Sequence, residues 1–205
     1  MIIAKDLIFV KTKSMFKLKI ITSTVRPGRK GPIITSWAEN IAKEFGKFEV
    51  EVLDLGVINL PMMNEPNHPM LKKYQHDHSK EWSKKIESAD AFIFVTAEYD
   101  YNYPAPLRNA LEYLFFEWGY KAAGIISYGG ISGGTRAANA LKADLSTLKI
   151  VPIGESVNFP FFNQSINDDE IFVPNENAKP GMIKLLNELF RWTKGLKSIK
   201  EDSNN

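Results

Sequence analysis

Three stretches of the chain contain most of the residues that could bind a ligand. Residues 22–31 read TSTVRPGRKG and combine hydroxyl groups, backbone amides and three cations. Residues 96–110 read TAEYDYNYPAPLRNA, with three tyrosines within five positions, and residues 127–135 read SYGGISGGT, with four glycines. These compositions suit, in turn, an anion such as phosphate, a flat heteroaromatic group, and the close approach of backbone to a ligand.

The first stretch predicts a phosphate site because it leads into a helix. Gly31-Pro32 opens the helical pattern, and the free amides and dipole of a helix start attract anions. Arg26 and Arg29 add guanidinium forks that match phosphate oxygens, and Lys30 adds a third cation. The spacing fits neither a Walker loop nor a GxGxxG fingerprint. A solvated loop with an ordinary helix cap is the alternative for this stretch.

The other two stretches follow predicted buried strands. Clustered tyrosines make a poor solvent loop, so residues 96–110 favour a stacking surface over the alternative of a packed turn before a helix. Glycines permit positive φ angles in residues 127–135, although a glycine-rich turn alone is a weak indication. Because ligands of open α/β sheets lie beyond the carboxyl ends of the strands, we expect the three stretches to form one site.

Composition excludes several classes of function. The chain has 205 residues, no cysteine and a formal net charge of +2, so thiol catalysis, zinc-thiolate sites and iron–sulfur clusters are ruled out. No clustered basic face suggests nucleic-acid binding, and no apolar run is long enough for a membrane span. No metal site is expected, because the His76-Asp77-His78 stretch is better read as a solvated helix entry. We expect a cytoplasmic protein whose redox chemistry, if any, needs a bound cofactor.

Strand and helix patterns alternate along the chain and predict an α/β fold. Strands are expected at residues 16–22, 48–53, 91–96, 122–127 and 150–153, and helices at residues 31–45, 79–88, 105–118, 135–148 and 181–196. Right-handed crossovers then give a five-stranded parallel sheet with the flavodoxin-like order 2-1-3-4-5 in a three-layer sandwich. We expect residues 1–15 to be an N-terminal extension, residues 16–197 the single domain, and residues 198–205 a solvated tail.

The helix expected at residues 105–118 predicts a subunit contact. One side carries a core stripe, and Tyr113 and Phe116 lie off that stripe, so a second side is also apolar. A helix that is apolar on two sides is usually buried on both. A homodimer is therefore expected, with packing against the final helix as the alternative.

From about Phe16 to Pro160 the chain resembles the NAD(P)H-dependent FMN reductase family, which includes chromate- and quinone-reducing members. The most specific part is TAEYDYNYPAPLRNALEYLFFEW, similar to that family's Pro-Glu-Tyr-Asn…Pro…Leu-Lys-Asn-Ala motif. The family's Gly-Ser-x-Arg motif falls on residues 23–26, and its glycine-rich loop on residues 128–134. The resemblance implies that FMN phosphate binds at Thr24, Arg26, Arg29 and Lys30, and that the isoalloxazine ring lies among Glu98, Tyr99, Asp100, Tyr101, Tyr128, Gly129 and Gly130.

The resemblance also implies the activity. Hydride passes from NADPH or NADH through FMN to a small acceptor (quinone, flavin, azo dye or metal oxyanion), with ping-pong kinetics and no protein acid or base. The alternative is an FMN-binding electron-transfer or regulatory module without nicotinamide turnover. The chain departs from the family pattern at Ser23, Ala97 and Asp100, which stand for Gly, Pro and Asn. An ionised Asp100 near the ring is expected to lower the FMN potential relative to an Asp100→Asn variant.

Overall fold

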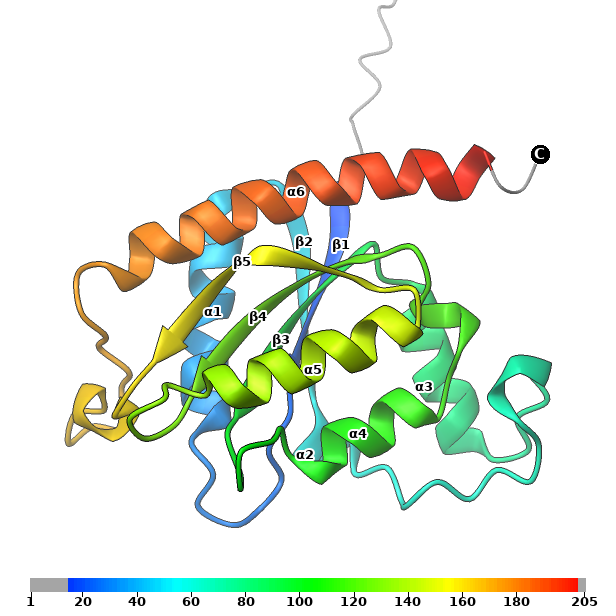
Figure 1. The fold of residues 1–205 in the computed structure, drawn as a ribbon, viewed down its shortest axis with the longest axis horizontal. Coiled ribbons are helices and arrows are strands. Elements are labelled where there is room, and N and C mark those ends of the chain that lie inside the picture. The colour runs from blue at the N-terminus through cyan, green and yellow to red at the C-terminus, as the bar shows by residue number, and fades with distance from the viewer. Residues whose placement is uncertain (1–14, 203–205) are drawn as a thin grey trace, which may run out of the picture.

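The computed structural model describes residues 15–202, which form a parallel sheet flanked by helices (Figure 1). Within these residues the sheet has five strands in the order β2-β1-β3-β4-β5, all paired in parallel. The predicted flavodoxin-like architecture is therefore confirmed. The strands are β1 (Phe16–Thr22), β2 (Phe48–Asp54), β3 (Ala91–Ala97), β4 (Ala122–Tyr128) and β5 (Val151–Phe159).

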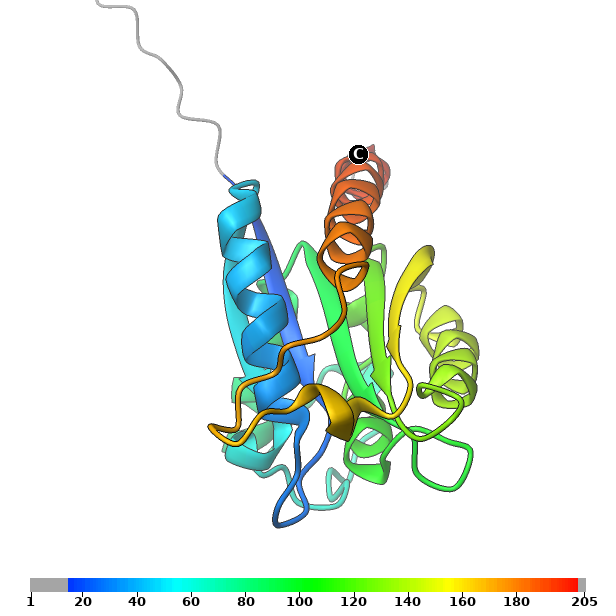
Figure 2. The same ribbon diagram turned by 90° about the vertical axis from the view of Figure 1, so that its left-hand side faces the viewer.

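Helices cover both faces of the sheet and create two apolar cores (Figure 2). On one face, α1 (Gly31–Phe45) and α6 (Ala178–Asp202) pack against alternate residues of the strands. On the other face lie α3 (Asp77–Glu87), α4 (Ala105–Glu112) and α5 (Thr135–Thr147). Every residue of β3 and β4 is buried, as expected for central strands covered on both sides. Short helical turns complete the chain: α2 (Leu55–Ile58), η1 (Pro69–Leu71), η2 (Phe116–Trp118) and η3 (Phe162–Ser165).

The last strand is longer than the sequence pattern indicated. A strand at residues 150–153 was expected, but β5 continues to Phe159. As an edge strand it tolerates Pro152 and exposes polar residues, so its pattern is weak, and a register shift interrupts its pairing with β4 between Ala123 and Ile125. The extra length carries the chain to the same edge of the sheet as the loops after β1, β3 and β4 (Figure 1).

The prediction of one continuous helix over residues 105–118 is also wrong. The α-helix ends at Glu112, and a separate turn, η2, follows. The indole of Trp118 donates a hydrogen bond to the carbonyl of Leu111 at 3.2 Å, an acceptor that a continuous helix would use for the amide of Phe115. Folding back in this way places the buried Trp118 ring against Phe92, with ring centroids 5.1 Å apart.

The structure corrects the predicted limit at the C-terminal end of the domain, and it does not describe the predicted N-terminal extension. Helix α6 runs through Asp202, beyond the predicted end at residue 196, so the first part of the expected tail at residues 198–205 is helical. Residues 1–14 of the expected N-terminal extension lie outside the described residues, and that assignment stays a prediction. Within residues 15–202, no helix combines the length and the apolar character that crossing a bilayer requires.

Candidate functional site

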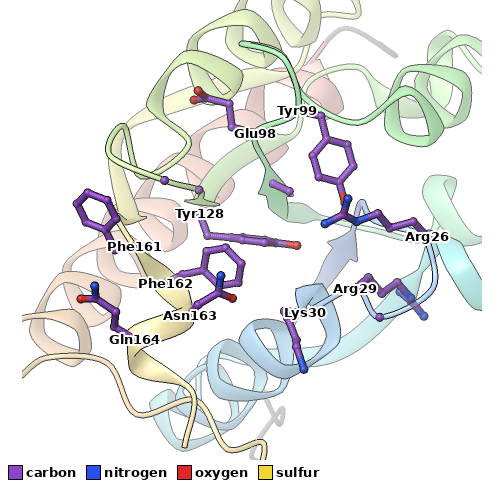
Figure 3. Close-up of a pocket in the computed structure, with 14 residues that line it drawn as sticks. Arg26, Arg29, Lys30, Glu98, Tyr99, Tyr128, Phe161, Phe162, Asn163 and Gln164 are labelled. Carbon is purple, nitrogen blue, oxygen red and sulfur yellow. The ribbon is translucent and has the colours of Figure 1, made fainter.

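A cleft of about 530 Å³ opens at the carboxyl ends of the strands (Figure 3). Its volume lies in the usual range of small-molecule and cofactor sites, and its position beside β1 and β3 is where strand order reverses in the sheet. All three predicted loops contribute to it. The lining residues are Arg26, Gly28, Arg29, Lys30, Ala97, Glu98, Tyr99, Tyr128, Gly129, Gly130, Phe161, Phe162, Asn163 and Gln164.

The loop after β1 lines the cleft with Arg26, Gly28, Arg29 and Lys30. Thr24 is buried, and its hydroxyl lies 3.4 Å from the hydroxyl of Tyr128. Gly31 starts α1 in a space that only hydrogen fits, because a Cβ there would lie 2.4 Å from Oγ1 of Thr24. The Arg26 guanidinium lies over the ring of Tyr99 at 5.1 Å from its centroid, which joins the first loop to the second.

Two of the three predicted phosphate cations already have carboxylate partners. Arg29 forms a two-pronged ion pair with Asp54, at 2.5 and 2.8 Å, and also donates to the carbonyl of Thr24. Lys30 pairs with the exposed Glu170 at 2.5 Å. Both residues line the cleft, so they lie where the sequence placed them, but Arg29 mainly fixes the shape of its own loop. Arg26 has no carboxylate partner among the described residues.

The start of α1 fits the phosphate of FMN. No side chain caps this helix, so amides of its first turn are free to bind an anion. In the loop that leads into this helix, the buried hydroxyl of Ser23 has no hydrogen-bond partner among the described residues. An unpaired buried hydroxyl is costly, and a bound phosphate group is one way to satisfy it. Together with the tight packing at Gly31, these features make a cradle that suits an oxyanion.

The loop after β3 enters the cleft only through its first residues. Glu98 and Tyr99 line it, whereas Asp100 and Tyr101 are exposed residues that do not. Both take positive φ angles, 48° and 69°, in a turn closed by hydrogen bonds between Tyr99 and Asn102. The guanidinium of Arg136 stacks on the Tyr101 ring at 3.8 Å. Eight of the eleven predicted site residues therefore line the cleft, Thr24 lies against Tyr128 without lining it, and Asp100 and Tyr101 lie outside it.

The Glu98 carboxylate is engaged with the glycine-rich loop and α5. It accepts hydrogen bonds from the Ser132 hydroxyl at 2.8 Å and from the Arg136 backbone amide at 3.2 Å, and it pairs with the Arg136 guanidinium at 2.5 Å. Burial acts to raise the pKa of Glu98, but the bonds from Arg136 and Ser132 outweigh it and hold the pKa below its usual value. This carboxylate is a brace between two loops of the cleft.

The glycine-rich loop after β4 provides the cleft's floor and one wall. Tyr128 is buried, and burial raises the pKa of its hydroxyl to about 12, so the group stays protonated and can donate a hydrogen bond. Gly129 and Gly130 line the cleft beside it. Gly134 has a φ of 81°, and a Cβ there would lie 2.7 Å from the amide of Tyr128, so the turn requires glycine at this position.

The segment after β5 was missed by the sequence reading. Its residues Phe161, Phe162, Asn163 and Gln164 all line the cleft, and in Figure 3 Phe161 and Gln164 lie on the opposite side of it from Arg26 and Arg29. The Phe162 ring packs on Tyr128 with centroids 4.8 Å apart. The run FPFFNQ at residues 159–164 is unusually aromatic for a solvent-exposed loop and could have indicated a binding surface. Because the predicted strand ended at residue 153, the sequence did not bring this run to the carboxyl ends of the strands.

The fold and the cleft define a flavodoxin-like α/β protein with a cleft of cofactor size at the carboxyl ends of its strands. The family model described as NADPH-dependent FMN reductase matches residues 16–164. The chain therefore belongs to the NADPH-dependent FMN reductase family. It is accordingly an oxidoreductase with FMN as cofactor and NAD(P)H as co-substrate, which confirms the cofactor and co-substrate that the resemblance implied.

Individual relatives agree with this assignment. The chain is 37% identical over 148 residues to an NAD(P)H-dependent FMN reductase of Schizosaccharomyces pombe, covering 70% of this chain and 74% of that protein. It is 32% identical over 195 residues to an NAD(P)H-dependent FMN reductase of a Nectria species, and the match covers 85% of this chain and 96% of that protein. Its fold matches that of the flavoenzyme NAD(P)H:(acceptor) oxidoreductase FerB of Paracoccus denitrificans, with a TM-score of 0.71, 19% identity, and coverage of 88% and 98%.

Proposed function

We propose that this cleft holds FMN, and that NAD(P)H and then a small electron acceptor use its open side in turn. The observation that carries the proposal is the uncapped start of α1, which directly follows Arg29 and Lys30 of the cleft lining. The far end presents Gly129 and Gly130, whose backbone allows the close approach of a flat ring, and the aromatic segment at residues 161–164 lies next to them. Quinones, azo dyes, free flavins and metal oxyanions are the acceptor classes to be compared.

The chain's own residues bind and orient. The first turn of α1, Thr24 and Arg26 hold the phosphate, while Arg29, fixed by Asp54, keeps that loop in shape. Glu98 holds the second and third loops together. Bound FMN supplies the redox chemistry, so that NAD(P)H, a proton and a quinone give NAD(P)⁺ and a hydroquinone. No protein group in the cleft has to donate or remove a proton for hydride transfer.

Steady-state kinetics on protein of measured FMN content test the proposal. NADPH and NADH are each oxidised against a quinone, an azo dye, chromate and free FMN. Parallel double-reciprocal lines are expected, since one site serves both substrates in turn, and intersecting lines would contradict a shared site. A yellow protein that does not oxidise NAD(P)H would be an electron carrier, and a colourless protein that takes up no FMN would be a regulatory module.

A substitution at Gly31 tests the location of the phosphate. In Gly31→Ala the new methyl group would meet Thr24 and Tyr128 at 2.4 and 3.0 Å, so the cradle must open. Overpacking of this kind costs roughly 1–3 kcal/mol, which corresponds to about 5- to 150-fold weaker FMN binding if the strain falls on the site. Gly195→Ala is the control, because a Cβ on that α6 residue meets nothing within 4 Å. Equal FMN affinity in both variants would place the phosphate elsewhere.

We also propose that the protein is a cytoplasmic homodimer. Of the two residues that the sequence placed at the subunit contact, only Phe116 remains available for it. Tyr113, expected at a subunit contact, is instead buried within its own chain, where its hydroxyl donates to the Pro61 carbonyl at 3.0 Å. Phe116 remains 48% exposed, and Met62, Met70 and Leu71, which lie between α2 and α3, are exposed as well. Light scattering during gel filtration measures the assembly, and a Phe116→Glu variant that runs as a monomer would assign the interface to this surface.

A further inference from the structure

We propose that Phe161 determines acceptor specificity by offering its ring to planar aromatic acceptors. This inference rests on the proposed function and narrows its acceptor class to flat, conjugated organic molecules. It goes beyond the family assignment because the segment at residues 161–164 lies at the end of the matched region and outside the three loops that the resemblance covers.

The backbone holds Phe161 in a conformation that phenylalanine rarely adopts. Its φ and ψ are 47° and 39°, the left-handed region, which costs an L-residue with a Cβ roughly 1–2 kcal/mol. Two hydrogen bonds fix it there: its amide donates to the Gly130 carbonyl at 3.1 Å, and its carbonyl accepts from the Gln164 amide at 2.9 Å. Glycine would be the ordinary residue at such a position.

Packing within the protein does not account for the Phe161 side chain. Phe161 is 50% exposed, and its ring stacks on no other aromatic ring among the described residues. Its neighbour Phe162 differs in this respect, because that ring packs edge-on against Tyr128. An apolar ring kept half exposed on a strained backbone, and lining a cleft, is placed for a ligand rather than for the core.

Strain alone would not support this conclusion, as Tyr120 shows. Tyr120 is also a partly exposed aromatic residue with a left-handed backbone, with a φ of 59° and an exposed fraction of 38%. It precedes β4, at the opposite edge of the sheet from the cleft, and lies near Lys149. Among the aromatic residues that the structure describes, only Phe161 combines this backbone with a position in the cleft. Tyr120 lines a separate cavity and therefore serves as a matched control.

The position of Phe161 in the cleft points to the acceptor class. Arg26, Arg29 and Lys30 lie across the cleft from it in Figure 3, at the end suited to the phosphate. The ring therefore belongs to the end where flat groups bind. Aromatic rings attract one another when they stack or pack edge to face. The Phe161 ring is therefore expected to favour a naphthoquinone over a compact, non-planar ion such as ferricyanide.

The test compares these two acceptors in three variants. With NADPH as donor, Phe161→Leu is expected to lower kcat/KM for 2-methyl-1,4-naphthoquinone by about three- to tenfold and to leave ferricyanide unchanged. Phe161→Tyr, which keeps the ring, should restore the wild-type ratio of the two acceptors. Tyr120→Leu should show the same ratio of kcat/KM for the two acceptors as the wild type. The dissociation constant of FMN, from quenching of flavin fluorescence, should be equal in all four proteins.

A binding measurement makes the test independent of turnover. The FMN-loaded protein is titrated with 2-naphthoate, a redox-inert planar aromatic, and the flavin spectrum is followed; Phe161→Leu should bind it at least threefold more weakly. Unchanged naphthoate binding, or an equal loss with both acceptors, would overturn the role of Phe161. Weaker FMN binding with an unchanged acceptor ratio would also overturn it, because Phe161 would then hold the cofactor. A wild-type protein that oxidises NADPH with neither acceptor, yet shows the naphthoate effect, would instead refute the proposed function.

Discussion

The loops after β3 and β5 both carry aromatic and polar residues, but they contribute to the cleft in opposite ways. In the β3 loop, residues 98–103, only Glu98 and Tyr99 reach the cleft, and the Glu98 carboxylate is held by Arg136. In the β5 segment, all four residues 161–164 line it. The loop that looked richest in ligand-binding groups is largely a structural brace, and the less conspicuous segment supplies a wall of the site.

The difference arises from where each side chain finds its partner. Tyr101 stacks with Arg136, and the hydroxyl of Tyr103 donates to Asp144, on α5. These contacts are made within the protein, so they leave little for a ligand. In the β5 segment, the side chains of Asn163 and Gln164 are exposed and have no hydrogen-bond partner among the described residues. Density of functional groups in a sequence therefore indicates a site only when those groups are not already paired.

The largest effect is expected from removing the brace in Glu98→Ala. The variant loses the bonds to Ser132 and Arg136, and we expect it to lose about 1–2 kcal/mol of unfolding free energy, because Arg136 is partly exposed and its share is screened. That corresponds to a melting temperature lower by roughly 2–8 °C, with or without FMN. Thermal unfolding of apoprotein and holoprotein measures it. A loss confined to the holoprotein would make Glu98 a ligand of FMN instead of a brace.

The same carboxylate predicts a pH dependence. Because the pKa of Glu98 is lower in the folded protein than its ordinary value of 4.5, ionisation stabilises the fold above that value. The contribution is lost as the pH falls below 4.5 and through the folded-state pKa. The stability advantage of the wild type over Glu98→Gln should thus be full at pH 7 and shrink under acid conditions. An advantage independent of pH would show that the charge does not contribute.

A smaller and more selective effect is expected at the β5 segment. Asn163→Ala removes an amide that lines the cleft, and one neutral hydrogen bond to a ligand is worth about 0.5–1.5 kcal/mol. FMN binding or the acceptor KM should weaken by roughly 2- to 12-fold, while the melting temperature of the apoprotein stays unchanged. Asn187→Ala, an exposed α6 residue outside the cleft, is the control. A melting temperature that falls with unchanged binding would reverse the comparison between the two loops.

The sequence predicted the sheet order and eight of the residues that line the cleft, for physical reasons that these loops illustrate. Continuous apolar runs identified β3 and β4, since strands covered on both faces bury every residue. The edge strand β5 lacks that pattern, so the strand was predicted too short and the segment at residues 161–164 was missed. The ion pairs Arg29–Asp54 and Glu98–Arg136 join residues 25 and 38 positions apart, and no local pattern indicates such pairs.

Replacing Tyr101 should affect the β3 loop only slightly. Tyr101→Leu removes the ring under Arg136, an exposed contact, so the melting temperature should fall by only about 1–3 °C. FMN binding should change less than about twofold, because the ring does not line the cleft. Fluorescence titration and thermal unfolding give both values. A loss of FMN affinity of tenfold or more would return Tyr101 to the binding site and weaken the contrast with the β5 segment.

The smallest effect is expected at Asp100, where the sequence alone predicted an electrostatic influence on the flavin. Asp100 is exposed and does not line the cleft, so water screens its charge. In bulk water two unit charges interact by only about 1 kcal/mol even at roughly 4 Å, and a more distant pair interacts less. We therefore expect Asp100→Asn to raise the FMN potential, as the sign of the charge requires, but by well under the roughly 40 mV per electron that 1 kcal/mol represents. Spectroelectrochemical titration at low and high salt measures the shift. A larger rise that persists at high salt would mean that the turn at residues 99–102 brings the carboxylate into the cleft when FMN is bound.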